Sequence, residues 1–401
     1  MTLTEIKVFP CQDTMKLRQL HIKGFKSIDG DLGQLVPFED VTVLLGANGS
    51  GKSNLLSFIE MSRSLARQEL GEFVAKQGVS RLLYYGPQNT DDISFIASFD
   101  DGGISRYEVT LKRGLPDGLS VGSERIGFGQ YHRVGENVPA TLPQDEYGAS
   151  VLAESYYLPK GQRGESTLAD DENETGRLIY DFLSRIRIYQ FNDTSETAKI
   201  RYRNYVDDAK YLRHDASNLA AFLKMLKDNS AYKKYYNRIV RHIQRVMPQF
   251  KDFDFEPIPG NQEHVRLNWK DSFGSGYLFD PHQISDGSLR FMALATLSLQ
   301  PPDLLPRLIV LDEPELGLHP AAITELGGLV RAAARNTQVI LCTQSTRLID
   351  EFDLQNLVIV ERDRMRHCSI FKTLNAEQFG DWLARYSLSE LWEKNVIGGQ
   401  P

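Results

Sequence analysis

The segment "GANGSGKS", residues 46–53, constrains the fold of this chain more than any other stretch of the sequence. It fits the pattern G-x-x-x-x-G-K-[ST] in full, and it lies between an apolar run at 41–45 and a helical pattern at 54–59. Glycines let backbone N–H groups turn inward around phosphate oxygens, and the following helix directs its positive end at them. Because strand, loop and helix come in this order, the sequence predicts an α/β core with a phosphate-binding loop rather than a chance glycine-rich turn.

The loop also supplies two side chains with separate roles. Lys52 is predicted to reach the outer phosphates of a nucleotide, and Ser53 to offer its hydroxyl oxygen to Mg²⁺. The nucleotide contacts predicted for the loop are Asn48, Gly49, Ser50, Gly51, Lys52, Ser53 and Asn54.

A second polar site is predicted in "LIVLDEPELGLHP", at 308–320. Four apolar residues precede Asp312 and Glu313, as in a buried central strand that presents two carboxylates at its C-terminal end, where open α/β sheets bind ligands. We expect Asp312 to hold Mg²⁺ through its water shell, and Glu313 to orient and deprotonate an attacking water. Adjacent acids also occur in solvated turns. We favour a functional role for this pair because the same chain contains a complete phosphate loop.

The stretch "ISDGSLRF", at 284–291, runs from a polar turn into an apolar-spaced helix. Ser285 and Gly287 stand at the helix entry, where a hydroxyl and backbone N–H groups favour an anion. Because the phosphate loop already serves the chain's own nucleotide, we interpret this entry as a site for the γ-phosphate held by another subunit. An ordinary helix N-cap is the alternative.

Taken together, "GFKSI", "GANGSGKS", "ISDGSLRF" and "LIVLDEPELGLHP" resemble the ABC-type ATPases of the SMC/RecF/OLD branch, over residues 17–60 and 280–362. The resemblance implies ATP and Mg²⁺ as ligands, and two protomers that sandwich two ATP molecules with Ser285 and Gly287 completing the partner's site. It also implies that Lys26 and Ser27 approach the nucleotide. A narrower resemblance, over nearly the whole chain, is to bacterial predicted ATPases related to OLD nucleases and to phage-defence systems such as PARIS and Septu.

Two glutamines follow predicted strands near this site. Where the branch usually places a histidine that touches the γ-phosphate, after the strand "VILCT", this chain has Gln344. Glutamine can donate a hydrogen bond to phosphate but cannot carry a proton, so Gln344 is predicted to be a weak catalytic group, and slow hydrolysis and a benign substitution both stay open. Gln190, in "RIYQFND", is predicted to sense the γ-phosphate beside Mg²⁺, with an ordinary surface glutamine as the alternative.

The remaining patterns place these motifs in a larger architecture. Alternating runs at 93–99 and 104–111 indicate an antiparallel hairpin, and a mainly helical pattern follows from residue 178 to about residue 248. We predict an α/β P-loop NTPase fold, an ABC-type ATPase head with an antiparallel β-subdomain and an inserted helical lobe. The predicted segments are 1–176, the first part of the core with the β-subdomain; 177–250, the helical lobe; 251–375, the second part of the core; and 376–401, a helical tail.

Composition restricts the binding partners and the cellular compartment that can be expected for this chain. The 46 Lys and Arg against 53 Asp and Glu give a formal net charge of −7, so the chain lacks a global basic field for indiscriminate nucleic-acid binding. Its three cysteines, Cys11, Cys342 and Cys368, form no C-x-x-C pair, which favours a reducing interior. The sequence has neither an apolar run of membrane-spanning length nor a hydrophobic signal core, and therefore predicts a cytoplasmic protein without a membrane partner.

Three functional hypotheses follow from these features. The leading one is an ATP-hydrolysing switch that assembles through ATP as a homodimer or higher even oligomer and controls a separately encoded effector, a nuclease or toxin in anti-phage defence. The second is a RecF-like, ATP-gated clamp that grips DNA through a basic helix face, although such a face is more commonly solvated surface or a site for an acidic protein. The third is a scaffold that binds ATP without turnover, which Gln344 favours and Glu313 disfavours. The basic face comprises Lys233, Lys234, Arg238, Arg241 and Arg245.

Overall fold

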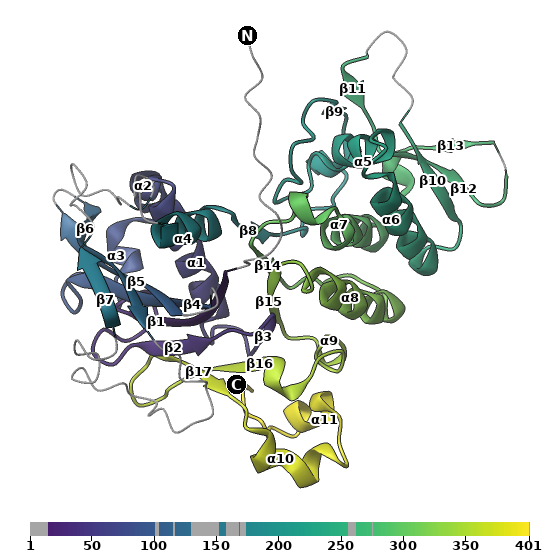
Figure 1. Ribbon diagram of the computed structural model, residues 1–401. Coiled ribbons are helices and arrows are strands. Elements are labelled where there is room, and N and C mark those ends of the chain that lie inside the picture. Colours follow the sequence, from purple (N-terminus) through teal and green to yellow (C-terminus); the bar gives the residue numbers. More distant parts are fainter. Residues whose placement is uncertain are drawn as a thin grey trace, which may run out of the picture. The chain divides into compact units, whose positions relative to one another are not determined.

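The computed structural model describes residues 15–100, 104–114, 117–129, 152–157, 168, 174–255, 262–274 and 276–400 (Figure 1). Cys11 therefore lies outside the described residues. The chain folds as two compact units, one formed by Met1–Pro37 with Ser64–Ser184 and the other by Phe38–Arg63 with Arg185–Pro401. These units cut across the four predicted segments, because the strand before the phosphate loop pairs with strands from the second half of the chain.

The first unit is built on a six-stranded antiparallel sheet, which contains the predicted hairpin as its pair β4 and β5. Along β5 the buried residues alternate with partly exposed ones, as the pleat of a sheet with one covered face requires. In sheet order the strands are β2 (Gln34–Pro37), β1 (Lys16–Lys23), β4 (Asp92–Asp100), β5 (Ile104–Gly114), β6 (Gly118–Gly129) and β7 (Leu152–Tyr157). The helices of this unit are α2 (Leu70–Gln77), α3 (Val79–Leu82) and α4 (Glu174–Ser184).

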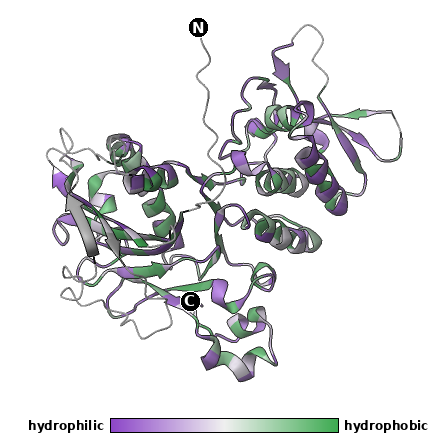
Figure 2. Cartoon of the chain, viewed as in Figure 1, coloured by the Kyte–Doolittle hydropathy of each residue, from purple (hydrophilic) through white to green (hydrophobic). Residues whose placement is uncertain are grey.

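The second unit is built on another six-stranded sheet, which is parallel except for one edge strand. Its three central strands are buried along most of their length, as the apolar runs predict, and the fold is the expected α/β core (Figure 2). In sheet order the strands are β17 (Ser369–Thr373), β16 (Leu357–Arg362), β3 (Val41–Leu45), β15 (Gln338–Thr343), β14 (Leu308–Asp312) and β8 (Ile186–Tyr189).

Helices and two small sheets complete the second unit. The helices are α1 (Lys52–Ala66, which continues into the first unit), α5 (Leu219–Asp228), α6 (Lys233–Val246), α7 (Asp286–Leu299), α8 (Pro320–Ala333), α9 (Thr346–Ile349), α10 (Ala376–Leu383) and α11 (Leu388–Glu393). The small sheets contain β10 (Phe250–Asp254), β12 (Asn268–Asp271) and β13 (Leu278–Phe279), and β9 (Asn204–Tyr205) with β11 (His264–Val265). Short 3₁₀ turns occur at Lys199–Arg201, Pro281–Gln283, Pro302–Leu304 and Leu354–Asn356.

The segment predicted as a helical lobe contains α5 and α6, and also the core strand β8; α6 is amphipathic as expected. Its buried residues are Tyr236, Ile239, Val240 and Ile243, and the helix packs against α7. The five predicted basic side chains of α6 are all exposed, and the helix is coloured as largely hydrophilic in Figure 2. Within the described part of the chain, no helix combines the length and apolarity needed to cross a bilayer.

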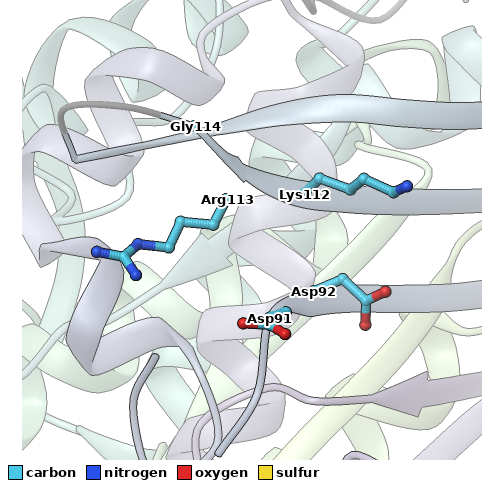
Figure 3. A pocket seen from close by; sticks show the side chains of 5 residues that line it. All are labelled: Asp91, Asp92, Lys112, Arg113 and Gly114. Atoms are coloured by element: carbon cyan, nitrogen blue, oxygen red, sulfur yellow. The ribbon is translucent and has the colours of Figure 1, made fainter. Parts of the chain in front are cut away.

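An open hollow of about 490 Å³ lies in the first unit, where β4 begins and β5 ends (Figure 3). Its lining residues are Asp91, Asp92, Lys112, Arg113 and Gly114. The two carboxylates offset the two cations, so this hollow does not favour an anionic ligand. The phosphate loop and the strand ends predicted to bind the nucleotide lie in the second unit.

Candidate nucleotide-binding site

Four parallel strands of the second unit end at one edge of its sheet and carry the predicted site. They are neighbours in the order β3, β15, β14, β8, and Thr343 at the end of β15 pairs with Leu45 at the end of β3. Ligands of open α/β sheets bind outside the carboxyl ends of such strands. The residues that lie in or directly follow these strand ends are the phosphate loop from Gly46, Gln344, Asp312 with Glu313, and Gln190.

The phosphate loop has a backbone that only its glycines allow. Gly49 and Gly51 have φ values of +79° and +120°, in the range that side chains rarely adopt. A Cβ on Gly46 would overlap the carbonyl oxygen of Val360, so β16 packs directly against the loop. Lys52 Nζ donates to the carbonyl oxygen of Gly46 and, at 3.0 Å, to that of Ala47, which folds the lysine back over its own loop.

The charges of this edge are buried together. Burial lowers the pKa of Lys52, although the neighbouring carboxylates Glu313, Asp312 and Glu315 act in the opposite direction. Burial and the nearby Glu313 raise the pKa of Asp312. Desolvation therefore disfavours the charged forms of both Lys52 and Asp312. A ligand with phosphate oxygens would stabilise the ammonium, and a divalent cation would stabilise the carboxylate.

The donor set fits a nucleotide with Mg²⁺. Gln190 Nε2 donates to Asp312 Oδ2 at 3.3 Å, so the amide and the carboxylate lie together, and Ser53 stands at the start of α1. Hydroxyl, carboxylate and amide oxygens are the hard ligands that Mg²⁺ prefers. Ser50 Oγ is buried and makes no hydrogen bond, so the loop also holds a polar atom that needs a partner.

Gln344 connects the phosphate loop to the predicted catalytic base. Its Nε2 donates to Asn48 Oδ1 at 2.7 Å and to Glu313 Oε1 at 2.9 Å. Glu313 itself has a φ of +45°, a left-handed conformation that is unusual for a residue other than glycine and is found at functional sites. Gln344 is thus hydrogen-bonded to the phosphate loop and to Glu313, while its predicted contact with the γ-phosphate stays a prediction.

Glu315 is a further carboxylate at this edge that sequence reasoning missed. Thr343 Oγ1 donates to its Oε1 at 2.5 Å, whereas its Oε2 is buried and has no partner. Burial raises the pKa of Glu315, with a smaller contribution from Glu313. The second glutamate of "DEPE", two residues beyond Glu313, was the signal that could have found it.

Ser285 is the N-cap of α7. Its Oγ accepts from the N–H of Ser288 at 3.2 Å and donates to Ser288 Oγ at 2.8 Å, which is the ordinary capping role considered for the sequence. Ser285 is nevertheless exposed, so the cap faces outward. Gly287 has a separate structural role, because a Cβ there would lie 2.5 Å from the carbonyl oxygen of Gly317 in the turn before α8. His319 in turn caps α8, because its Nδ1 accepts from the N–H of Ala321.

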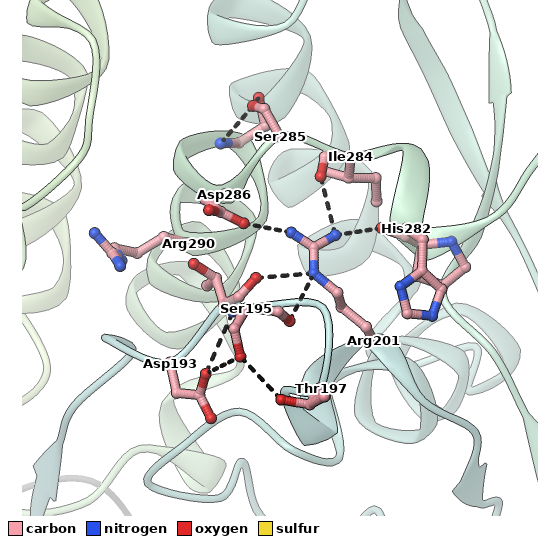
Figure 4. Close-up of polar contacts among 12 residues, drawn as sticks. Asp193, Ser195, Thr197, Arg201, His282, Ile284, Ser285, Asp286 and Arg290 are labelled. Carbon is pink, nitrogen blue, oxygen red and sulfur yellow. Dashed lines mark hydrogen bonds and ion pairs between the residues drawn. The ribbon is translucent and has the colours of Figure 1, made fainter.

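Arg201 holds the start of α7 in place (Figure 4). The side chain is only 5% exposed and donates to the carbonyl oxygens of Pro281 and Ile284 at 2.6 and 2.9 Å and to Asp286 Oδ1 at 2.5 Å. Its Nε also donates to the carbonyl oxygens of Thr194 and Ser195, at 2.8 and 3.2 Å. One guanidinium therefore joins the segment after Gln190 to the turn that presents Ser285.

Arg290 makes a second connection between the same segments. Its Nε and Nη2 donate to the carbonyl oxygens of Phe191 and Asn192, at 2.8 and 2.9 Å. A Cβ on Gly317 would lie 2.9 Å from Arg290 Nη1, so the turn after Glu313 also packs on this arginine. Neither arginine carried a sequence signal, because a basic residue in a helical pattern is normally surface.

Lys26 and Ser27 belong to the first unit. Lys26 has a φ of +49°, and its N–H donates to the carbonyl oxygen of Leu82 at 2.8 Å, while Ser27 is buried. Their predicted approach to the nucleotide stays a prediction.

Comparison with known proteins agrees with this geometry. Residues 41–350, more than half of the chain, match the family described as "AAA domain, putative AbiEii toxin, Type IV TA system". The chain belongs to this AAA-domain family. A DNA replication and repair protein RecF from Anaeromyxobacter dehalogenans is 33% identical over 119 residues, which are 27% of this AAA-family chain and 28% of that protein. The match therefore spans less than a third of RecF.

Solved structures extend the likeness to the whole fold. An Smc head bound to the C-winged helix domain of ScpA superimposes with a TM-score of 0.54 at 15% identity, over 91% of this chain and 99% of that one. An Smc head with an extended coiled coil from Pyrococcus furiosus, bound to the C-terminal domain of ScpA, gives a TM-score of 0.50 at 15% identity, over 92% and 99%. The predicted fold, a P-loop ABC-type ATPase head, is confirmed.

Proposed function

We propose that this chain binds and hydrolyses ATP with Mg²⁺ and that two copies close around two ATP molecules, so that nucleotide state controls a separate effector. The observation that carries the proposal is the convergence of Lys52, Asp312, Glu313 and Gln344 on one sheet edge, with Gln344 hydrogen-bonded to both Asn48 and Glu313. The exposed helix start at Ser285 supplies the surface for the second copy.

The hydrolysis follows from these positions. A water oxygen attacks the γ-phosphorus, the bond to the oxygen of the β-phosphate breaks, and Glu313 takes the proton of the water. Lys52 leaves its loop carbonyls for the phosphates, and Gln344 orients the water through its amide. Ser53 and Asp312, with Gln190 beside them, would hold Mg²⁺, which would supply positive charge to the phosphate oxygens. Because Gln344 cannot supply a proton, we expect slow turnover.

The effector is proposed to be a nuclease or toxin encoded separately, acting in anti-phage defence. The description of the matched family names a putative toxin and a toxin–antitoxin system, which supports this proposal. The Smc head of similar fold was solved bound to a domain of ScpA, a separate protein, which supports a head that signals through a partner.

Replacing Ser285 by arginine tests the composite site. The bulky cation should block approach of a second copy, so we expect a monomeric mass with Mg·ATP and a loss of about tenfold or more in hydrolysis, while ATP binding remains. Light scattering with phosphate release measures both. The matched control is Asn375→Arg at another exposed N-cap, of α10. Normal hydrolysis by the Ser285 variant would contradict the composite site and leave Ser285 with only its role as the N-cap of α7.

A second candidate, a RecF-like DNA clamp, is favoured by the exposed basic face of α6 and by the similarity to RecF. We expect DNA binding, if this function holds, to fall steeply with salt and to weaken about tenfold or more in the double variant Arg238→Glu/Arg241→Glu. Arg335→Glu/Arg385→Glu, at exposed positions outside α6, is the control for charge alone. Fluorescence anisotropy with duplex DNA between 50 and 200 mM salt decides the matter, and equal binding by both double variants would exclude the α6 face.

A further inference from the structure

The phosphate loop is supported on its outer side by a distant segment. The N–H of Ala47, the second residue of the loop, donates to the carbonyl oxygen of Gly399 at 2.9 Å. The N–H of Gly399 in turn donates to Glu361 Oε1 at 2.8 Å, and Glu361 lies on β16 beside the loop. The backbone of Gly399 is thus bonded on one side to the loop and on the other to the sheet.

The two glycines of this segment are required by its close packing. Gly398 and Gly399 have φ values of +80° and +84°, which disfavour any side chain. A Cβ on Gly398 would overlap Glu361 Oε1, the atom that accepts from Gly399. A Cβ on Gly399 would lie 3.1 Å from Ile359 Cγ2 and 3.3 Å from Trp392 Nε1. "GG" here marks a close approach of backbone to the sheet and not merely a loose turn.

The segment is anchored at several points beyond the glycines. Gln400 Nε2 donates to the carbonyl oxygen of Trp392 at 2.9 Å, and Leu391 of α11 is fully buried in the core of the unit. Ser389 at the start of α11 donates from its N–H and its Oγ to Asp350, at 2.9 and 2.6 Å, directly after α9. α9 itself begins two residues after Gln344, so the segment is connected both to the phosphate loop and to the strand end that carries Gln344.

Glu361 is held charged in this position. Burial opposes its ionisation, but the ammonium of Lys372 and the N–H of Gly399 outweigh burial and hold the pKa of Glu361 below its usual range. A charged acceptor makes a stronger hydrogen bond to the Gly399 N–H than a neutral one would.

We propose that Gly398 to Gln400, docked on Glu361, is a strap that holds the phosphate loop in its nucleotide-binding shape, with Gly399 and Glu361 as positioning residues. The inference rests on the proposed function, because it assigns this support to ATP binding. The N–H of Ala47 is occupied by the strap, so the strap acts on the loop from behind and leaves the following loop residues to meet the phosphates.

Gly398→Ala tests the strap, because its methyl group would displace Glu361 from Gly399. We expect the Kd for a fluorescent ATP analogue, and the KM for ATP, to rise about 5- to 30-fold with kcat nearly unchanged. Gly276→Ala is the matched control, since Gly276 has a φ of +70° and a Cβ there would meet open space. Glu361→Gln, which keeps an acceptor oxygen, should bind the analogue more tightly than Glu361→Leu, which does not.

Hydrogen exchange without nucleotide separates the strap from the proposed function. We expect the amide of Ala47 to exchange faster in Gly398→Ala than in wild type or Gly276→Ala, whether or not the protein binds ATP. Unchanged exchange of Ala47, or an unchanged Kd despite faster exchange, overturns the strap. Failure of the wild-type protein to bind the analogue instead overturns the proposed function, while the exchange result still decides whether the segment holds the loop.

Discussion

Replacing Glu313 by glutamine should lower the rate of ATP hydrolysis by a factor of about 10²–10⁴, the range that general-base catalysis contributes, and leave ATP binding nearly unchanged. Glutamine keeps an oxygen that can accept from Gln344 Nε2, as Glu313 Oε1 does at 2.9 Å, so the hydrogen bond to Gln344 survives. What the substitution removes is the ability to take a proton from water. We therefore expect the variant to accumulate as an ATP-bound dimer.

Single-turnover phosphate release and light scattering with Mg·ATP measure the two parts of this prediction. Glu325→Gln is a suitable control, because Glu325 on α8 is a partly buried carboxylate that pairs with Arg245 and His242 and has no predicted part in the chemistry. Its hydrolysis rate should equal that of wild type. A Glu313→Gln protein that hydrolyses ATP at the wild-type rate would show that another group, with Glu315 as the nearest alternative, accepts the proton.

The sequence predicted the strand ends of this site well, for a physical reason. A strand buried on both faces must be apolar, so its end is visible where polar residues begin, as at Asp312 and after Leu45. The phosphate loop adds glycines whose spacing follows from the φ values that the turn needs. Motifs that combine a buried apolar strand with glycines at positive φ can therefore be predicted from the sequence alone.

The connections between the motifs were not predictable in the same way. Arg201 and Arg290 act through bonds to backbone carbonyls, which carry no side-chain signature at the receiving end. Ala47 and Gly399 are joined only by main-chain atoms across most of the sequence. Pairings of this kind depend on which segments the sheet order brings together, and β3 lies between β15 and β16 although both follow it by some 300 residues in the chain.

Arg201→Met should destabilise the second unit by about 3–5 kcal/mol, because each buried carbonyl oxygen left without a donor costs about 1–3 kcal/mol. Methionine has a similar length but no donor, so the carbonyl oxygens of Pro281, Ile284 and Thr194 would lose their hydrogen bonds. Water cannot easily replace these bonds, because the Arg201 side chain is only 5% exposed. Asp286 contributes less, because its side chain is 67% exposed and water can replace the arginine. For a unit of this size the loss corresponds to a fall of about 6–20 °C in the melting temperature.

Differential scanning calorimetry with and without Mg·ATP checks this prediction, and Arg203→Met is its matched control. Arg203 is two residues away and exposed, so its replacement should change stability by no more than about 0.5 kcal/mol. Arg201→Lys should be intermediate, since an ammonium has three donors where the guanidinium makes five bonds. Equal melting temperatures for Arg201→Met and Arg203→Met would contradict the network. A large loss confined to Arg201→Met would instead show that the segment after Gln190 fixes the turn presenting Ser285. The proposed Mg²⁺ site and the proposed dimer surface would then be joined by a direct structural connection.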